Sequence, residues 1–408
     1  MDKNILIIGG GASGMFASIV AAQNGAKVTL FERNDRVGKK LLATGNGRCN
    51  FTNENMNLKF FHGEDVSFVR STFEIFSKDM TIDFFENMGI SPATEDEGKV
   101  YPNSFQASSV LDCLRYEMDR FNVDIKTNSF VTEIIKDKNG FKVKLKSGEN
   151  YFGDKVILAT GGVAMPVSGS DGNGYNLVKI YGHNTNKTTP ALVQLKLNWD
   201  KLKQVNGVKV VGRISLIYQD KEIRSDYGDL LFTDYGISGP PVLQISREGV
   251  KLFEEGKNPK VKISIMSSKT EEQVFSYLIT RFNNLSYKSI EDALIGFINK
   301  KLILPILKEL NIPKDLLAGD LHKNHIRELA RVFTAWDFEV IGHKGWGQAQ
   351  TTAGGILTKD INPLTMESKL TKGLYIIGEV LDVDGDCGGY NLQWAWSSGY
   401  IAGLNASS

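Results

Sequence analysis

Residues 5–14 read ILIIGGGASG, and this stretch decides the fold. Its four apolar residues at the start suit a short strand buried in a parallel sheet. The glycines that follow, Gly9, Gly11 and Gly14, match the G-x-G-x-x-G pattern that joins a strand to a helix in dinucleotide-binding proteins. There the first glycine permits a tight turn, the second lets a pyrophosphate approach, and the third lets helix and strand pack closely. The stretch therefore predicts a Rossmann-type unit.

The residues after the glycines complete this unit. Small and apolar residues over 13–24 have helical spacing, and Gly25 is a typical residue to end the helix. The open N-terminus of that helix offers unpaired N–H groups and a positive dipole to phosphates. A second strand is expected over 27–32, with Glu32 at its end placed to accept hydrogen bonds from ribose hydroxyls. These features fit FAD and NAD equally.

Three later segments favour FAD as the cofactor. Residues 156–162 read VILATGG, an apolar strand that resembles the second signature of flavoproteins of the two-dinucleotide-binding type. A glycine turn, GSDGNG, follows at 169–174, as in fumarate-reductase-like flavoproteins. Residues 373–379 read GLYIIGE and resemble the C-terminal flavin signature, in which a strand ends in a glycine and an acid. We expect FAD, with NAD(P)H as a possible transient electron donor.

The chain has 408 residues, too many for one ordinary core. From about residue 191 the sequence pattern changes to short alternating segments separated by turn residues. The first part predicts helices over 66–88 and 108–121 and a hairpin turning at Asn139-Gly140. Alternating segments then predict an antiparallel sheet or barrel, followed by helices over 270–282, 290–310 and 322–334. The predicted fold class is α/β, a Rossmann-type FAD-binding domain interrupted by an inserted β-barrel-like and helical domain. The expected domains are 1–190 and 346–408 for FAD, and 191–345 as a substrate or cap domain.

Charge and cysteine content exclude several functions. The chain has 48 basic and 47 acidic side chains, a net charge of +1. It therefore lacks the excess of basic residues expected for binding to nucleic acid or an anionic membrane. No signal peptide precedes the first strand, and no apolar run reaches the roughly 18 residues of a membrane-spanning helix. The three cysteines are far apart, and no histidines have metal-ligand spacing. We expect a cytoplasmic protein with a small-molecule substrate and no metal; the oligomeric state is open.

Two longer segments carry a more specific resemblance. Residues 38–50 read GKKLLATGNGRCN, and residues 378–395 read GEVLDVDGDCGGYNLQWA. With 99–102, 232–240 and 365–369, they resemble the YhiN-like and BaiN-like NAD(P)/FAD-dependent oxidoreductases, the aminoacetone oxidase family of FAD-binding flavoproteins. The likeness runs to about Gly403 and departs mildly at 352–356, where TAGGI stands in place of an expected T-x-G-G-V.

The resemblance implies a cytosolic FAD enzyme whose last helix points its N-terminus at the flavin. Arg48 supplies a fork of hydrogen-bond donors beside two glycines, and Cys49 is expected to be a small packing residue. The motifs together predict these cofactor-binding residues: Gly9, Gly11, Ala12, Ser13, Gly14, Glu32, Arg33, Lys40, Gly45, Gly47, Arg48, Cys49, Asn50, Val131, Ala159, Thr160, Gly161, Gly378, Glu379, Asp384, Gly389, Tyr390, Asn391 and Leu392. The catalytic residues stay unknown, with Tyr101, Tyr235, His343 and Asp384 as polar candidates.

The predicted function is hydride transfer between a small organic substrate and FAD. One version is an NAD(P)H-linked reductase of a conjugated C=C bond, as in a bile-acid or steroid enone. Another is an amine oxidase that passes electrons to dioxygen, with aminoacetone as the type of substrate. A third, of a different class, is a non-catalytic flavin-binding protein.

Overall fold

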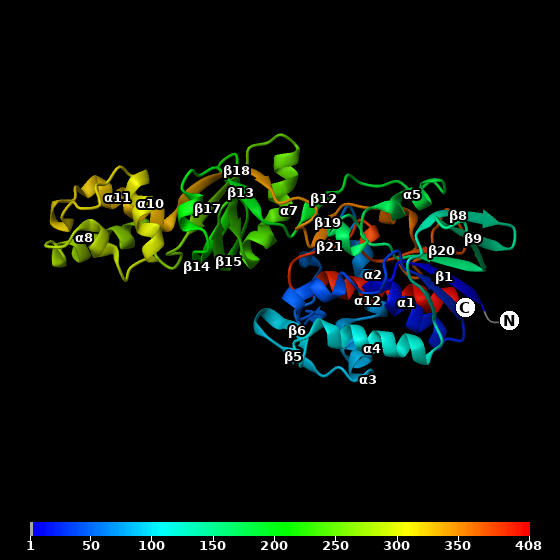
Figure 1. Cartoon of the computed structure of the whole chain (residues 1–408). Helices are drawn as coiled ribbons and strands as arrows, with labels where there is room; N and C mark the ends of the chain where they lie inside the picture. Colours follow the sequence, from blue (N-terminus) through cyan, green and yellow to red (C-terminus); the bar gives the residue numbers. More distant parts are fainter. Residues whose placement is uncertain (1–2) are drawn as a thin grey trace. The chain divides into compact units, whose positions relative to one another are not determined.

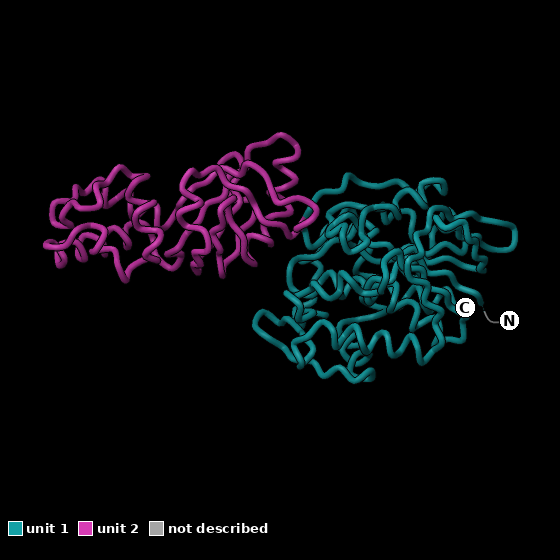
Figure 2. Tube along the Cα trace, in the orientation of Figure 1, with its two compact units in different colours: residues 1–190, 349–408 teal, residues 191–348 magenta. Residues whose placement is uncertain are grey.

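The computed structural model describes residues 3–408, which form two compact units (Figure 2). The first unit contains the chain up to Pro190 together with Ala349–Ser408, and the second contains Ala191–Gln348. The polypeptide therefore leaves the first unit once and returns to it for its last sixty residues. The substrate or cap role predicted for the second unit stays a prediction.

The first unit is built on a five-stranded sheet with the strand order β20-β11-β1-β2-β7 (Figure 1). Every neighbouring pair in this sheet is parallel. The bounds are β1 Asn4–Ile8, β2 Lys27–Phe31, β7 Asp124–Lys126, β11 Lys155–Leu158 and β20 Leu374–Ile376. β2 and β11 flank β1 on opposite sides, so the order of the chain reverses at β1. In open α/β sheets such a switch point leaves a ligand crevice at the carboxyl ends of the strands.

Two helices from opposite ends of the chain pack closely on each other beside this sheet (Figure 1). They are α1, Ala12–Gln23, and α12, Tyr390–Ser407. On α12, a Cβ at Gly399 would lie 2.8 Å from the Ser13 carbonyl oxygen, and one at Gly403 would lie 2.7 Å from that of Ala17. Glycine is therefore needed at both positions, because any side chain would push the helices apart.

The segment 66–88 forms two helices, so the prediction of one helix was wrong. α2, Ser67–Ile75, ends at Phe76, whose extended backbone buries its ring. α3, Lys78–Asn87, then begins at the N-cap Ser77, whose hydroxyl accepts from the Met80 N–H. The hairpin is present as predicted, and a third strand extends it into a small antiparallel sheet. Its strands are β8 Val131–Asp137, β9 Gly140–Leu145 and β10 Asn150–Gly153.

Shorter elements complete the first unit. They are β3 Thr52–Asn53, β4 Phe61–His62, β5 Pro92–Thr94, β6 Lys99–Pro102, α4 Ala107–Arg120, α5 Asn173–Lys179, β12 Thr189–Ala191, β19 Thr351–Ala353 and β21 Asp384–Gly385.

The second unit contains a closed barrel in the order β13-β16-β15-β14-β17-β18, which confirms the predicted barrel. Its strands are β13 Leu195–Leu197, β14 Lys209–Tyr218, β15 Lys221–Thr233, β16 Gly236–Ser238, β17 Lys260–Ser264 and β18 Trp336–His343. Its helices are α6 Leu202–Val205, α7 Pro240–Glu254, α8 Glu271–Asn284, α9 Ile290–Leu294, α10 Lys300–Glu309 and α11 Lys323–Thr334. The single helix predicted over 290–310 was wrong, because Ile295 is extended and Gly296 has a φ of +76°. Within residues 3–408, no helix has the length and apolar character that crossing a bilayer requires.

Candidate functional site

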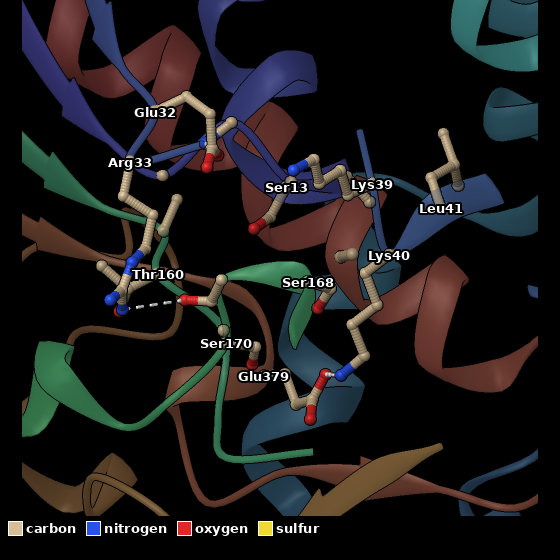
Figure 3. Close-up of a pocket in the computed structure, with 18 of the residues that line it drawn as sticks. Ser13, Glu32, Arg33, Lys39, Lys40, Leu41, Thr160, Ser168, Ser170 and Glu379 are labelled. Carbon is tan, nitrogen blue, oxygen red and sulfur yellow. Dashed lines mark hydrogen bonds and ion pairs between the residues drawn. The ribbon is translucent and has the colours of Figure 1, made fainter. Parts of the chain in front are cut away.

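A cleft of about 1180 Å³, including open solvent at its mouth, lies in the first unit (Figure 3). The residues that end three parallel strands line it: Ile8 of β1, Phe31 and Glu32 at β2, and Ala159 after β11. The cleft therefore occupies the switch point of the sheet. The first turn of α12 lines it as well, through Asn391 and Leu392.

Of Gly9, Gly11 and Gly14 in the loop after β1, one position is open and two are crowded. A Cβ at Gly9 would lie 2.4 Å from the Ala159 carbonyl oxygen, and one at Gly14 would lie 1.9 Å from that of Gly9. A Cβ at Gly11 would meet no protein atom within 4 Å. Gly11 is also the N-cap of α1, and no side chain caps the helix there. The loop thus leaves space and a free helix N-terminus where a pyrophosphate would fit.

Glu32 is held in place by the loops around it. Its Oε2 accepts from the Gly10 N–H at 3.0 Å, and its Oε1 accepts from the N–H of Asn34 at 2.8 Å and from the Asn34 side chain at 2.9 Å. The residue is 8% exposed and lines the cleft. A carboxylate with fixed orientation at the end of β2 suits recognition of a ribose.

Arg33 and the glycine turn at 169–174 form another wall. The Arg33 guanidinium lies 4.5 Å from the centre of the Phe130 ring and 2.5 Å from Asp171. The Asn34 amide donates to the Ser168 carbonyl at 2.9 Å and thereby ties β2 to this turn. The sequence pattern identified the turn, but it did not predict that Ser168, Ser170 and Asp171 line the cleft.

Buried polar atoms without partners supply a second test of the cofactor. Among the described residues, Thr160 Oγ1 and Asn50 Oδ1 are buried and have no hydrogen-bond partner. Thr160 lines the cleft. Asn50 Oδ1 would lie 2.9 Å from a Cβ placed on Gly389, next to the first turn of α12. Both atoms are covered by protein atoms and are not exposed in the cleft, so the features that fit FAD are the open space at Gly11, the uncapped start of α1 and the carboxylate of Glu32.

An ion pair joins distant parts of the chain inside the cleft. Lys40 Nζ lies 2.6 Å from Glu379 Oε2, and Figure 3 shows the two side chains pointing toward one another. Glu379 Oε1 accepts from the Thr352 N–H at 3.0 Å. Thr352 Oγ1 in turn accepts from the N–H groups of Val163 and Ala164, at 2.8 and 3.0 Å. This chain of contacts fixes the acid of the C-terminal signature.

The N-terminus of α12 is left without a capping side chain. Its N-cap, Gly389, has a φ of +95°, and a Cβ there would lie 2.4 Å from the Thr52 carbonyl oxygen. The Asn391 side chain turns away from the helix start and bonds to the N–H and carbonyl of Gly385. Asn391 and Leu392 of this first turn line the cleft, and the helix dipole makes that end positive.

A second cavity, with about 600 Å³ of empty space including open solvent, lies beside the loop at 45–50. Arg48, Glu95, Asp96, Lys99 and Tyr101 line it. Glu95 holds the Arg48 guanidinium through both carboxylate oxygens, at 3.0 and 3.1 Å. Arg48 donates to the Tyr101 hydroxyl at 3.2 Å. Burial raises the pKa of Tyr101, while the charges of Arg48 and Lys99 act to lower it.

Cys49 is a packing residue, as the sequence predicts. It is fully buried, and burial raises the pKa of its thiol to about 12. The thiol therefore stays protonated near neutral pH, and a nucleophilic role is unfavourable.

The cleft brings together fourteen of the predicted cofactor-binding residues. They are Gly9, Gly11, Ala12, Ser13, Glu32, Arg33, Lys40, Val131, Ala159, Thr160, Gly161, Glu379, Asn391 and Leu392. The remaining ten predicted residues do not line the cleft, and of these Arg48 lines the second cavity. They are Gly14, Gly45, Gly47, Arg48, Cys49, Asn50, Gly378, Asp384, Gly389 and Tyr390.

The four catalytic candidates fall in different places. Tyr101 lines the second cavity, and Asp384 is buried in β21. Tyr235 and His343 belong to the second unit, where Lys344 covers the Tyr235 ring at 4.2 Å. Burial lowers the pKa of His343. The assignment of these four residues to catalysis stays a prediction.

Comparison with known families decides the identity of the chain. The profile described as HI0933-like protein Rossmann domain matches residues 3–405. The chain belongs to this family. Within the HI0933-like family, a 3-dehydro-bile acid delta(4,6)-reductase of Clostridium scindens is 39% identical over 99% of both chains. A ribosomal RNA dihydrouridine synthase of Escherichia coli is 32% identical, over 97% of this chain and 96% of that protein.

A solved structure supports the fold. A 3-ketosteroid-delta4-(5alpha)-dehydrogenase from Rhodococcus jostii superposes with a TM-score of 0.51 at 13% identity, covering 100% of this chain and 97% of that one. At this identity the likeness concerns the fold alone. The predicted family, the predicted Rossmann-type fold with an inserted barrel, and the predicted enzyme class, an FAD-dependent oxidoreductase, are confirmed.

Proposed function

We propose that this protein uses bound FAD to reduce a C=C bond conjugated with a carbonyl group, with NAD(P)H as the electron donor. The observation that carries the proposal is the cleft at the switch point, with open space at Gly11 and an uncapped α12 helix at its wall. The substrate class is supported by the 39% identical relative, whose name is that of a bile-acid reductase.

Different residues of the chain would bind different parts of the cofactor. The N–H groups at the start of α1 would hold the pyrophosphate, and the carboxylate of Glu32 would accept from the ribose hydroxyls. Lys40 and Glu379 would lie along the middle of the cofactor. Bound FAD supplies a ring that accepts and donates hydride. The positive end of α12 stabilises negative charge on a group bound beside Asn391 and Leu392, which favours the two-electron reduced state.

An anaerobic titration tests the proposal. The purified protein should be yellow, and one equivalent of NADH or NADPH should bleach the flavin absorbance. Adding a steroid 4-en-3-one should then restore the colour and yield the saturated ketone. Bleaching by aminoacetone instead, with colour restored by dioxygen, would favour an amine oxidase. A flavin that no donor reduces would favour a non-catalytic flavin-binding protein.

Uridine in ribosomal RNA is a second candidate substrate, because two relatives that are 32% and 31% identical are named ribosomal RNA dihydrouridine synthases. Uracil also contains a C=C bond conjugated with a carbonyl, so the reaction class is unchanged. The net charge of +1 argues against a large RNA interface. The reduced protein should therefore be offered ribosomal RNA and the steroid in parallel, with dihydrouridine and saturated ketone as the two readouts. We also propose a cytoplasmic location, which the three free cysteines support.

A further inference from the structure

The second cavity is lined by Tyr101, whose hydroxyl group is free to donate a hydrogen bond. The Tyr101 hydroxyl oxygen accepts from Arg48 at 3.2 Å. Within residues 3–408, the hydroxyl proton of Tyr101 has no acceptor among the hydrogen bonds of the structure. Tyr101 is 4% exposed, yet it lines the cavity. A buried donor of this kind normally has a partner, so this one is available to a ligand.

Arg48 makes the hydroxyl a stronger donor. Because the guanidinium donates to the phenol oxygen, it withdraws electron density and polarises the O–H bond. Arg48 lies 4.4 Å from the centre of the Tyr101 ring and 5.9 Å from that of Phe105. Glu95 fixes the guanidinium through two hydrogen bonds. The pair is thus held in position before any ligand binds.

The charges around the cavity indicate what kind of ligand oxygen fits. Arg48 is neutralised by Glu95, and Lys99 is paired with Glu97. Asp96 adds a negative charge to the lining. A carboxylate ligand would have to displace Glu95, whereas a neutral carbonyl oxygen can accept from Tyr101 with no ion pair broken. Phe105 packs against the Tyr101 ring, with the ring centres 5.8 Å apart, and helps to hold that ring in place.

The segment 44–48 borders both this cavity and the cofactor cleft. Thr44 lines the cleft, and Arg48 lines the second cavity. Between them, a Cβ at Gly45 would lie 2.9 Å from the Asn50 N–H nitrogen and 3.3 Å from Tyr101 Cε1. Tyr101 therefore packs directly against the loop that forms part of the cleft wall.

We propose that the Tyr101 hydroxyl, polarised by Arg48, binds the carbonyl oxygen of a conjugated substrate and stabilises its enolate. This inference rests on the proposed function. When the far carbon of the C=C bond takes a hydride from the reduced cofactor, the π electron pair moves toward the carbonyl and places a negative charge on its oxygen. A proton from water then adds to the carbon next to the carbonyl and restores the C=O bond. The donor stabilises the charge while it exists.

Binding of 4-fluorophenol to the holoenzyme tests this role without turnover. A phenolate resembles an enolate, and its fluorine resonance reports binding and ionisation. We expect the wild-type resonance to move toward the phenolate position at pH 7. Tyr101→Phe keeps the ring but removes the donor, so it should lose this movement and bind about tenfold more weakly. Arg48→Met should give a partial loss, and it serves as the second variant if Tyr101→Phe does not fold. Equal affinity and equal shift in Tyr101→Phe and wild type would overturn the inference.

A matched control and a kinetic readout separate this inference from the proposed function. Tyr116→Phe removes a hydroxyl from a side chain that is 70% exposed and should change nothing. Tyr101→Phe should retain FAD and its rate of bleaching by NAD(P)H, but lose about 100-fold in the rate of the enone half-reaction. An unchanged enone rate in Tyr101→Phe overturns only the role of Tyr101. A wild-type protein that holds FAD but reduces no enone overturns the proposed function, while the fluorine signal still decides whether Tyr101 binds the phenol.

Discussion

Lys40 Nζ lies 2.6 Å from Glu379 Oε2, across 339 positions of sequence. Both side chains are about one-fifth exposed and line the cleft. The pair therefore joins the segment after β2 to the segment after β20, at the place where a cofactor with two phosphates would bind.

Replacing Lys40 should weaken FAD binding more than replacing Glu379. In the cleft proposed to bind FAD, Lys40→Met leaves the Glu379 carboxylate unpaired beside an anionic cofactor, so the dissociation constant of FAD should rise at least about tenfold. Glu379→Gln leaves a lysine beside the phosphates and should cost less. Titration of the apoprotein with FAD measures both constants. Lys144→Met, which breaks an exposed cross-strand pair with Glu133, is the control and should have no effect. An equal loss in the two cleft variants contradicts this electrostatic account.

The glycines of the first loop should separate folding from cofactor binding. Gly14→Ala places a Cβ 1.9 Å from a carbonyl oxygen and should destabilise the apoprotein by about 3 kcal/mol or more. Gly11→Ala meets no protein atom, and the φ of Gly11, −83°, suits alanine. We expect its apoprotein to melt at the wild-type temperature while its FAD affinity falls at least about tenfold, because the Cβ fills the space for the pyrophosphate. Gly347→Ala also has open space around its Cβ and should alter neither property.

Thr352, the first residue of the segment 352–356, should be important for stability. Thr352→Val removes the acceptor of two backbone N–H groups, those of Val163 and Ala164, in a side chain that is fully buried. The free energy of unfolding should fall by about 2–4 kcal/mol, measured by denaturant titration. Thr352→Ser keeps the oxygen and should restore most of the loss. The control, Thr280→Val on an exposed face of α8, should stay within about 0.5 kcal/mol of wild type. A Thr352→Val protein as stable as this control would refute the stabilising role of the Thr352 hydroxyl.

Cys49 should make the protein less stable at high pH. Burial raises the pKa of its thiol from 9.0 to about 12, so between these values the folded chain holds a proton that the unfolded chain has lost. The folded state is therefore favoured fully below pH 9, and this contribution is lost as the pH rises toward 12, by at most about 1.4 kcal/mol per pH unit. Cys49→Ser should flatten this slope. In the folded wild type at pH 8, a thiol reagent should label Cys113 and Cys387 and reach Cys49 only after unfolding. Rapid labelling of all three cysteines would contradict the burial of Cys49.

Features that depend on local spacing could be predicted from the sequence. The glycine loop and Glu32 each follow from a pattern within a few residues and lie where the pattern indicates, and alternating segments predicted the barrel but not all of its strands. The helix boundaries inside 66–88 and 290–310 could not be predicted in this way. Apolar periodicity continues through both segments, while the breaks depend on the burial of Phe76 and on the φ of Gly296.

Partners across long stretches of sequence were beyond prediction for a different reason. Arg48 was recognised as a fork of donors, but its acceptor Glu95 and its contact with Tyr101 depend on how the 92–102 hairpin packs against the 45–50 loop. The role of Thr352, in β19, depends on its contact with Val163 and Ala164 in the segment after β11. No pattern in either segment contains that information, because the contacts are made only in the folded chain.

The packing of α1 against α12 has a consequence for how the protein is made. Because α12 is translated long after α1, the buried face of α1 around Phe16 and Ala17 stays uncovered until Gly399 and Gly403 can dock on it. A chain truncated before Tyr390 should therefore expose apolar surface that cellular proteases recognise.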